Sequence, residues 1–278
     1  MTEIVAHSGI LRDTKVHAED TGGDGRPVVL LHGWPLSSAS WKYQTSPLFT
    51  AGHRVVAYDR RGFGQSDHPK HGFDYDHLAD DLDHVLTELD LRDVTLVGFS
   101  MGGGEVARYV ARHGEERLRS VVFAAAVTPY LLKTEDNPEG PLTKKQAADM
   151  TAQLTNDEDA FYDAFTTQFF SVDGELKVSE SQRQDALALC KQADKKAALG
   201  CMAAFGMTDF REDLATITVP TLVLHGDGDA TVPFEGSGAR THRVVSHSEL
   251  VVIDGAPHGL NVSHPDQFNQ ALIDFMAR

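Results

Sequence analysis

The chain has 278 residues, 41 % of them hydrophobic and 24 % charged, a composition that is ordinary for a globular protein with a sizeable core. With 41 acidic and 25 basic residues the net charge is −16, which argues against nucleic acid and against an anionic membrane surface as partners. No apolar run is long enough to span a membrane, and the N-terminus lacks the basic start and apolar stretch of a secretory signal, so we expect a cytoplasmic protein.

Six short apolar runs alternate with helix-like stretches along the chain. They are RPVVLLHG, HRVVAYDR, VTLVGFS, RSVVFAAAV, PTLVLHGD and ELVVIDG. Strands this rich in Val and Leu are usually buried on both faces, and the segments between them are long enough for crossover helices. The sequence therefore predicts an α/β fold with a doubly wound, mostly parallel sheet.

Two helices can be predicted from their apolar spacing. Between Tyr75 and Leu91, apolar residues recur every three to four positions, which is typical of an amphipathic crossover helix. Near the C-terminus, Ser263 is a candidate N-cap for a helix with Pro265 close to its start. The apolar face of that helix would carry Phe268, Leu272 and Phe275.

The strand pattern is interrupted from about residue 128 to residue 214. Helical patterns fill this region, in KKQAADMTAQL, DEDAFYDAFTTQFF and SQRQDALALCKQADKKAALGCMAAF. We expect one α/β domain over residues 1–278, with a helical cap inserted at about 128–214 and folded over one end of the sheet. The two cysteines, Cys190 and Cys201, lie in this region, and without an export signal we expect buried thiols rather than a disulfide.

One serine stands between a strand-like run and a helix-like run in VTLVGFSMGGGEVARYV. Ser100 has Gly98 two residues before it and Gly102 two residues after it. A strand that turns at once into a helix needs a tight, strained corner, and small neighbours leave room for it. The corner pushes the serine hydroxyl out towards a substrate, at a helix N-terminus that favours negative charge.

A serine hydroxyl needs a base, and the base needs a group that orients it. Asp229 in LHGDGDATVP and His258 in DGAPHGL each follow a strand, in the chain order that this architecture expects. His258 would take the Ser100 proton and return it to the leaving group, while Asp229 would hold the imidazole. Asp227 follows the same strand as Asp229 and competes for the acid role.

The developing oxyanion needs N–H donors that are already in place. The N–H of Met101 is one candidate, because it follows the serine at the start of the helix. The loop His32-Gly33-Trp34-Pro35 offers a second through Trp34, since Pro35 has no N–H.

Five stretches of the chain together resemble the α/β-hydrolase fold. They are HGWPLSSASW, YDRRGFGQSD, VGFSMGGGEVARYV, HGDGDATVPFEGSG and PHGLNVSHPD. More narrowly they resemble the cofactor-free haloperoxidase (perhydrolase) and arylesterase group, from about Gly22 to the C-terminus. Members of that group hydrolyse short-chain and aryl esters, and many make peracids from a carboxylic acid and hydrogen peroxide.

The resemblance implies catalytic roles for five positions. It implies a triad of Ser100, Asp229 and His258, with the N–H groups of Trp34 and Met101 as oxyanion donors, and it favours Asp229 over Asp227. Pro35 matches a proline that many peracid-forming members carry after the tryptophan. No metal and no organic cofactor is implied, and relatives are often homo-oligomers, although no feature of this sequence marks an interface.

Several other residues are weaker candidates. Pro35, Phe99, Leu131 and Val232 lie at or near motif positions and could line a substrate pocket, although apolar residues there are as often plain core. His32 and His225 each precede a glycine at a strand end, where we expect a structural hydrogen bond. For the helix flank with His77, Asp81 and His84 we expect a solvated face and no metal site.

The sequence thus predicts a serine hydrolase that acts on small carboxylic esters through an acyl-enzyme, with perhydrolysis as a second activity. The partners would be a small ester and, for perhydrolysis, hydrogen peroxide. One alternative is hydrolysis of an amide, a lactam or a carbon–carbon bond on the same triad. Another is a ligand-sensing protein of the same fold with little turnover, because fold alone does not establish catalysis.

Overall fold

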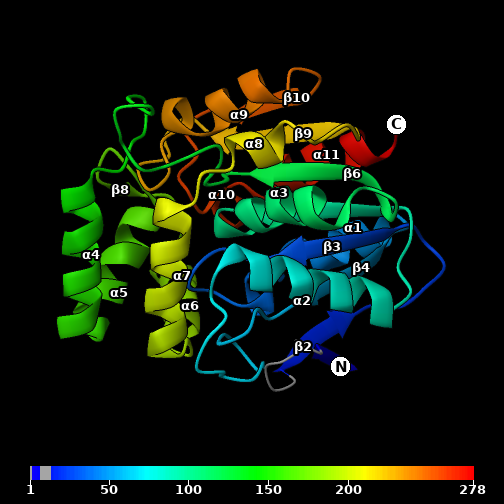
Figure 1. Ribbon diagram of the computed structural model, residues 1–278, viewed down its shortest axis with the longest axis horizontal. Coiled ribbons are helices and arrows are strands. Elements are labelled where there is room, and N and C mark those ends of the chain that lie inside the picture. Colours follow the sequence, from blue (N-terminus) through cyan, green and yellow to red (C-terminus); the bar gives the residue numbers. More distant parts are fainter. Residues whose placement is uncertain (1, 7–13) are drawn as a thin grey trace.

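A central eight-stranded sheet organises the chain, whose computed structural model describes residues 2–6 and 14–278. The strand order is β1-β2-β4-β3-β5-β6-β9-β10 (Figure 1). The strands are β1 (Thr2–Ala6), β2 (Thr14–Asp20), β3 (Pro27–Leu31), β4 (Arg54–Tyr58), β5 (Val94–Phe99), β6 (Leu118–Ala124), β9 (Thr221–Gly226) and β10 (Glu249–Ile253). All six predicted runs are strands of this sheet, and they pair in parallel.

Two further strands, β1 and β2, were not predicted. They pair antiparallel with each other, and β2 pairs antiparallel with β4. The sheet is therefore mostly parallel, as predicted, with an antiparallel extension at one edge. Strand β2 reads TKVHAED and alternates buried and more exposed positions, so it lacks the continuous apolar run that marks the inner strands.

The inner strands position the functional residues. Every residue of β5 and of β9 is buried, as Val- and Leu-rich strands with both faces covered should be. Strand β5 lies between β3 and β6, in the middle of the sheet. The residues that follow β3, β5 and β9 therefore meet at the same carboxyl edge.

Helices cover both faces of the sheet (Figure 1). On one face α2, α3, α8 and α9 contact one another in succession, and on the other α1 and α11 pack together. Their bounds are α1 (Thr45–Thr50), α2 (Tyr75–Glu88), α3 (Met101–His113), α8 (Arg211–Leu214), α9 (Gly238–Val244), α10 (Leu260–Ser263) and α11 (Pro265–Met276).

Both predicted helices are present. Helix α2 begins after Asp74, whose side chain accepts a hydrogen bond from the His77 N–H, and it buries Leu78, Leu82, Val85 and Leu86. Helix α11 starts at Pro265 and buries Phe268, Leu272 and Phe275. The predicted N-cap is wrong, however, because Ser263 ends the short helix α10 and the residue before α11 is His264.

Four helices between β6 and β9 lie together at one end of the sheet (Figure 1). They are α4 (Lys144–Asn156), α5 (Glu158–Phe169), α6 (Glu180–Cys190) and α7 (Lys195–Met207). Thr143 and Ser179 form capping boxes at the starts of α4 and α6, which explains where these helices begin. The expectation that this region contains no strands is wrong. The short strands β7 (Ser171–Val172) and β8 (Glu175–Leu176) pair in an antiparallel hairpin.

Both cysteines carry free, buried thiols, which confirms that prediction. Cys190 ends α6 and Cys201 lies within α7. Burial raises the pKa of the Cys201 thiol to about 12. No helix of the described residues is long and apolar enough to cross a membrane.

Candidate active site

The turn at Ser100 holds its backbone in a conformation that few residues adopt. Ser100 has φ 55° and ψ −117° and stands between β5 and α3. A Cβ atom on Gly98 would lie 2.5 Å from the Gly102 carbonyl oxygen, and one on Gly102 would lie 2.5 Å from the Leu31 carbonyl oxygen. Both glycines are thus required by the close approach of backbone to backbone.

This geometry predicts the effect of Gly98→Ala. The added methyl group has to displace the backbone of α3, so we expect the free energy of unfolding to fall by ~1–3 kcal/mol. Any hydrolysis that depends on Ser100 should slow as well, because the same displacement moves its hydroxyl. Urea unfolding and steady-state kinetics measure the two effects.

The control for this change is Gly206→Ala in α7. A Cβ there would meet only the Leu142 side chain, at an ordinary 3.4 Å. That variant should be as stable as the wild type or slightly more stable. Equal stability of the Gly98→Ala and Gly206→Ala variants would contradict the steric account of the turn.

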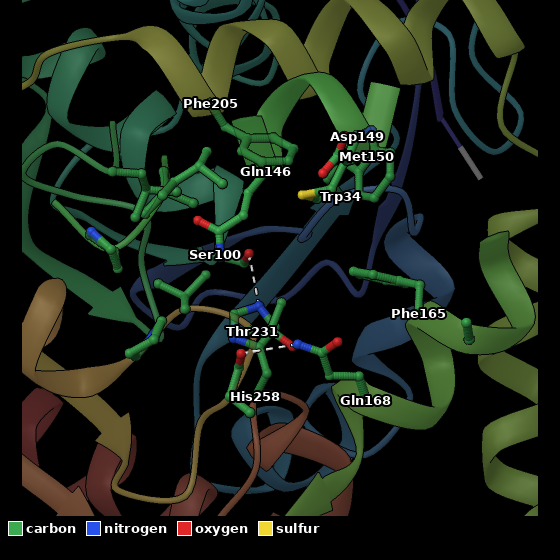
Figure 2. A pocket seen from close by; sticks show the side chains of 18 of the residues that line it. Trp34, Ser100, Gln146, Asp149, Met150, Phe165, Gln168, Phe205, Thr231 and His258 are labelled. Carbon is green, nitrogen blue, oxygen red and sulfur yellow. Dashed lines mark hydrogen bonds between the residues drawn. The ribbon is translucent and has the colours of Figure 1, made fainter. Parts of the chain in front are cut away.

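The structure brings the three predicted triad residues together. His258 Nε2 lies 2.9 Å from Ser100 Oγ (Figure 2). On the other side of the ring, His258 Nδ1 lies 2.6 Å from Asp229 Oδ2. All three side chains are almost fully buried. They come from the ends of β5, β9 and β10, which explains how residues 158 positions apart in sequence meet.

Asp229 is held as a carboxylate. Its Oδ1 accepts hydrogen bonds from the N–H groups of Thr231 and Val232, at 2.9 and 2.7 Å. Burial by itself would raise the pKa of Asp229, but the electrostatic interaction with the adjacent His258 and hydrogen bonds from His225 and His258 outweigh it and hold that pKa well below its usual value. A fixed anion beside His258 can stabilise an imidazolium during a reaction.

Asp227 does not reach His258 in this structure. Its Oδ1 instead accepts a hydrogen bond of 2.7 Å from the N–H of Gly255, in the turn after β10. The residue pattern alone left Asp227 and Asp229 as candidates for the acid that orients His258, and only Asp229 is in contact with that ring.

The two candidate oxyanion donors come from two separate segments of the chain. Met101 is the first residue of α3, where a backbone N–H has no acceptor within its own helix. Trp34 lies in the loop that follows β3, and β3 is the neighbour of β5 in the sheet. The Trp34 indole Nε1 donates to the carbonyl of Ala198 in α7, at 2.9 Å, so this helix is tied to the loop.

A cavity of about 510 Å³ opens over Ser100 and His258, and residues of α4, α5 and α7 line its other side (Figure 2). One wall is aromatic: Phe161, Phe165 and Phe205 pack edge-on against Trp34, with ring centroids 5.3 to 6.1 Å apart. Polar side chains of α4 and α5 also line the cavity, namely Gln146, Asp149, Gln153 and Gln168.

Two of the four residues that were weaker candidates for the substrate pocket line this cavity. Leu131 and Val232 line the cavity, whereas Pro35 and Phe99 are not among its described lining residues. Phe99 points into the core and packs against the His258 ring, with centroids 5.2 Å apart. Successive strand residues point to opposite faces of a sheet, so a neighbour of Ser100 need not share its cavity.

Comparison with known proteins agrees with this architecture. A family model described as the alpha/beta hydrolase fold matches residues 26–265. The chain belongs to the α/β-hydrolase family. It is 41 % identical to the non-heme chloroperoxidase of Kitasatospora aureofaciens, over 91 % of this chain and 93 % of that one. It is 39 % identical to the bifunctional esterase/perhydrolase of Acinetobacter calcoaceticus, over 93 % and 94 % of the two chains.

Among solved structures, a bromoperoxidase from Bacillus anthracis superposes on this α/β-hydrolase with a TM-score of 0.96 and 47 % identity, covering 100 % of this chain and 99 % of that one. These similarities confirm the resemblance to the haloperoxidase and perhydrolase group.

Most of the cavity lining of this α/β-hydrolase was not predicted. The aromatic side chains of α5 and α7 and the glutamines of α4 and α5 come from the helices between β6 and β9. Their apolar spacing indicated helices, but it could not indicate which face turns to the active site. Gln168 also donates to the carbonyl of Ala230, at 3.0 Å, and so ties α5 to the loop that carries Asp229.

A buried polar network supports the oxyanion loop. His32 Nδ1 donates to the Gly33 carbonyl at 2.8 Å, and His32 Nε2 accepts from the Arg60 N–H at 3.0 Å. The Arg60 guanidinium donates to the His32 carbonyl at 2.9 Å and to Glu105 Oε2 at 2.7 Å. His32 thus makes the structural hydrogen bonds that we expected of it.

This network predicts a pH dependence of stability. Burial and the charge of Arg60 lower the pKa of His32 well below its usual value, so the folded protein keeps this ring neutral while the unfolded chain takes up a proton below pH ~6.5. The stability that His32 contributes is therefore present above pH ~6.5 and is lost as the pH falls. We expect the free energy of unfolding to fall more steeply between pH 6 and pH 5 in the wild type than in His32→Gln, by up to ~1.4 kcal/mol per pH unit.

Urea unfolding at several pH values measures both slopes, and His68→Gln, at an exposed histidine, is the matched control. Equal slopes for the wild type and His32→Gln would contradict this account of the buried ring.

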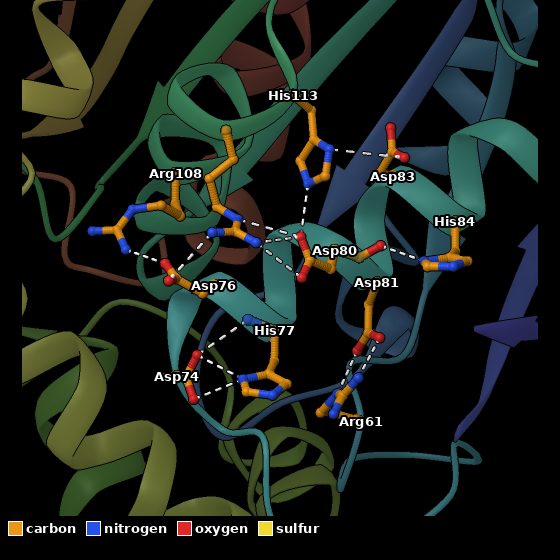
Figure 3. Close-up of polar contacts among 11 residues, drawn as sticks. Arg61, Asp74, Asp76, His77, Asp80, Asp81, Asp83, His84, Arg108 and His113 are labelled. Carbon is orange, nitrogen blue, oxygen red and sulfur yellow. Dashed lines mark hydrogen bonds and ion pairs between the residues drawn. The ribbon is translucent and has the colours of Figure 1, made fainter. Parts of the chain in front are cut away.

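The flank of α2 has partners other than a metal ion (Figure 3). His77 Nδ1 pairs with the Asp74 carboxylate at 2.8 Å. The expectation of a solvated face is wrong at Asp81, which is buried and forms an ion pair with Arg61. His84 Nδ1 lies 2.7 Å from the Asp80 carbonyl. Among the described residues, no group of three or more His, Cys, Asp or Glu side chains could hold a metal ion.

Proposed function

We propose that this protein is a serine hydrolase that cleaves small carboxylic esters through an acyl-enzyme on Ser100. One observation carries the proposal: the unbroken hydrogen-bond chain from Ser100 Oγ through His258 to Asp229, at the floor of a cavity. These are the contacts that turn a serine hydroxyl into a nucleophile.

The reaction follows from the positions of these atoms. Ser100 Oγ attacks the ester carbonyl carbon while His258 Nε2 takes the hydroxyl proton, and the N–H groups of Trp34 and Met101 hold the oxyanion. The tetrahedral intermediate then expels the alcohol, which receives its proton from His258, and leaves the acyl group on Ser100. Water attacks this ester with His258 as base, and the carboxylic acid departs.

The cavity favours an ester with an aromatic group. Its volume of about 510 Å³ and its aromatic wall at Trp34, Phe161 and Phe165 leave room for an aryl leaving group beside a short acyl chain. We therefore expect aryl acetates to be better substrates than long-chain acyl esters.

We also propose perhydrolysis as a second activity of the same site. Here hydrogen peroxide replaces water in the second step, attacks the acyl group on Ser100 and leaves as a peracid. Support comes from the names of the relatives, which include a bifunctional esterase/perhydrolase and non-heme haloperoxidases. Pro35 after Trp34, as in many peracid-forming members of the group, adds to this support.

In this proposal the chain is one α/β domain whose cap, at about residues 128–214, selects the substrate. The helices and loops of that region supply most of the cavity wall. The cytoplasmic location and the formation of homo-oligomers stay predictions.

A substrate panel tests the proposal and its alternatives. The wild type should hydrolyse phenyl acetate and p-nitrophenyl acetate, and with acetate, bromide and hydrogen peroxide it should brominate monochlorodimedone through peracetic acid. Turnover of lactams or vinylogous diketones without ester turnover would favour the alternative chemistries. No turnover of any of these compounds would favour a ligand-sensing role.

A further inference from the structure

His225 is a buried histidine of β9 beside the proposed catalytic acid. Its side chain is fully buried, and its Nε2 lies 3.2 Å from Asp229 Oδ2 and 2.9 Å from the carbonyl oxygen of Val232. Both neighbours are acceptors, so we assign the ring proton to Nε2. One N–H group is thus shared between the carboxylate and the loop that follows it.

The opposite edge of the ring has no such contact. His225 Nδ1 is buried and has no hydrogen-bond partner among the described residues. The backbone of Gly238 packs directly on it, because a Cβ at that position would lie 2.5 Å from Nδ1. The Phe234 ring also lies against the imidazole, with centroids 5.6 Å apart. The ring is therefore fixed in one orientation, with its proton directed at Asp229.

The Asp229 carboxylate receives four hydrogen bonds, two on each oxygen. Thr231 and Val232 donate to Oδ1 from the backbone of the loop, and His258 donates to Oδ2. The fourth donor, His225, is the only one of the four that lies in a strand of the sheet. Its second contact, to the Val232 carbonyl, also orients the loop that supplies both backbone donors.

We propose that His225 is a positioning residue for the hydrolytic reaction. Its Nε2–H fixes the rotation of the Asp229 carboxylate, and the carboxylate in turn fixes the plane and the tautomer of His258. His225 does not line the cavity, so it acts without touching the substrate. This inference rests on the proposed function, because it assigns His225 a task in the same reaction.

The test compares two substitutions of His225. His225→Leu fills the site with an apolar side chain and removes the donor, whereas His225→Gln supplies an amide N–H that can reach the same acceptors. For p-nitrophenyl acetate we expect kcat to fall roughly ten- to a hundredfold in the leucine variant, as for a lost hydrogen bond to a charged group, with KM nearly unchanged. The glutamine variant should recover most of kcat.

A spectroscopic readout keeps this test separate from the proposed function. The Nδ1 proton of His258, in its 2.6 Å hydrogen bond to Asp229, should give a low-field proton NMR signal in the wild type and in His225→Gln. The signal should shift or broaden in His225→Leu. It can be recorded even if the wild type hydrolyses none of the esters, in which case the proposed function fails while the positioning of the carboxylate is still measured.

Two results would overturn the inference. One is a His225→Leu variant with wild-type kcat and an unchanged low-field signal. The other is equal impairment of both variants with the signal unchanged, which would mean general destabilisation. Should His225→Leu fail to fold, Gly238→Ala displaces the ring from its far side, and an unchanged kcat in that variant would also overturn the inference.

Discussion

Ser100→Ala should remove nearly all ester hydrolysis and lower kcat/KM for p-nitrophenyl acetate by roughly 10⁴- to 10⁶-fold. Ser100 Oγ is the atom that His258 Nε2 contacts at 2.9 Å, so its loss leaves a base with no nucleophile to activate. The oxyanion donors and the cavity remain and account for a small residual rate. Steady-state assays of the two proteins, purified side by side, measure the ratio.

The matched control for this variant is Ser120→Ala. Ser120 is likewise a buried serine, but it lies within β6, where it hydrogen-bonds to Thr95 at 2.9 Å, and it does not line the cavity over His258. Its loss should leave kcat/KM close to the wild-type value. If Ser100→Ala kept more than about a tenth of the wild-type rate, Ser100 could not be the nucleophile.

Glu105→Ala should lower the free energy of unfolding by ~3–5 kcal/mol, the largest stability effect that we expect from a single side chain. Glu105 is fully buried in α3, where Oε2 accepts from Arg60 Nε at 2.7 Å and Oε1 accepts from the hydroxyl of Tyr58. Removing this carboxylate leaves the Arg60 guanidinium charged and without its partner in the interior. Urea unfolding followed by circular dichroism measures the change.

The same substitution should slow hydrolysis. Arg60 also donates to the carbonyl of His32, so it links the loop before Trp34 to the helix that begins at Met101. Glu249→Ala is the control, since Glu249 forms a surface ion pair with Arg278 and its loss should cost less than ~1 kcal/mol. If Glu105→Ala and Glu249→Ala lost equal amounts of stability, the buried Arg60–Glu105 ion pair would contribute no more than a surface pair, contrary to this account.

The sequence predicted the parts of this molecule that repeat a general pattern. Continuous Val and Leu runs identified the six parallel strands, and the residues after those strands identified Ser100, Asp229 and His258, which the structure brings within hydrogen-bond distance. Glycine spacing around Ser100 predicted a tight turn, and the backbone has the positive φ that such a turn requires.

What the sequence could not predict depends on side-chain direction and on long-range contacts. Phe99 directly precedes Ser100, yet it packs under the His258 ring instead of lining the cavity. The link between Glu105 and Arg60 spans 45 positions in the chain, and periodicity carries no signal for such a pair. The antiparallel strand β2 was missed because polar residues interrupt its apolar run.

The measurement that tests the central claim most directly is labelling with a p-nitrophenyl alkylphosphonate. Its phosphorus accepts one serine oxygen, releases one p-nitrophenolate and leaves a stable adduct that resembles the tetrahedral intermediate. We predict one phosphonyl group per chain, found on Ser100 by peptide mass spectrometry, and a loss of esterase activity in proportion to the label. Full esterase activity in a completely labelled protein, or a label on any other residue, would contradict the account.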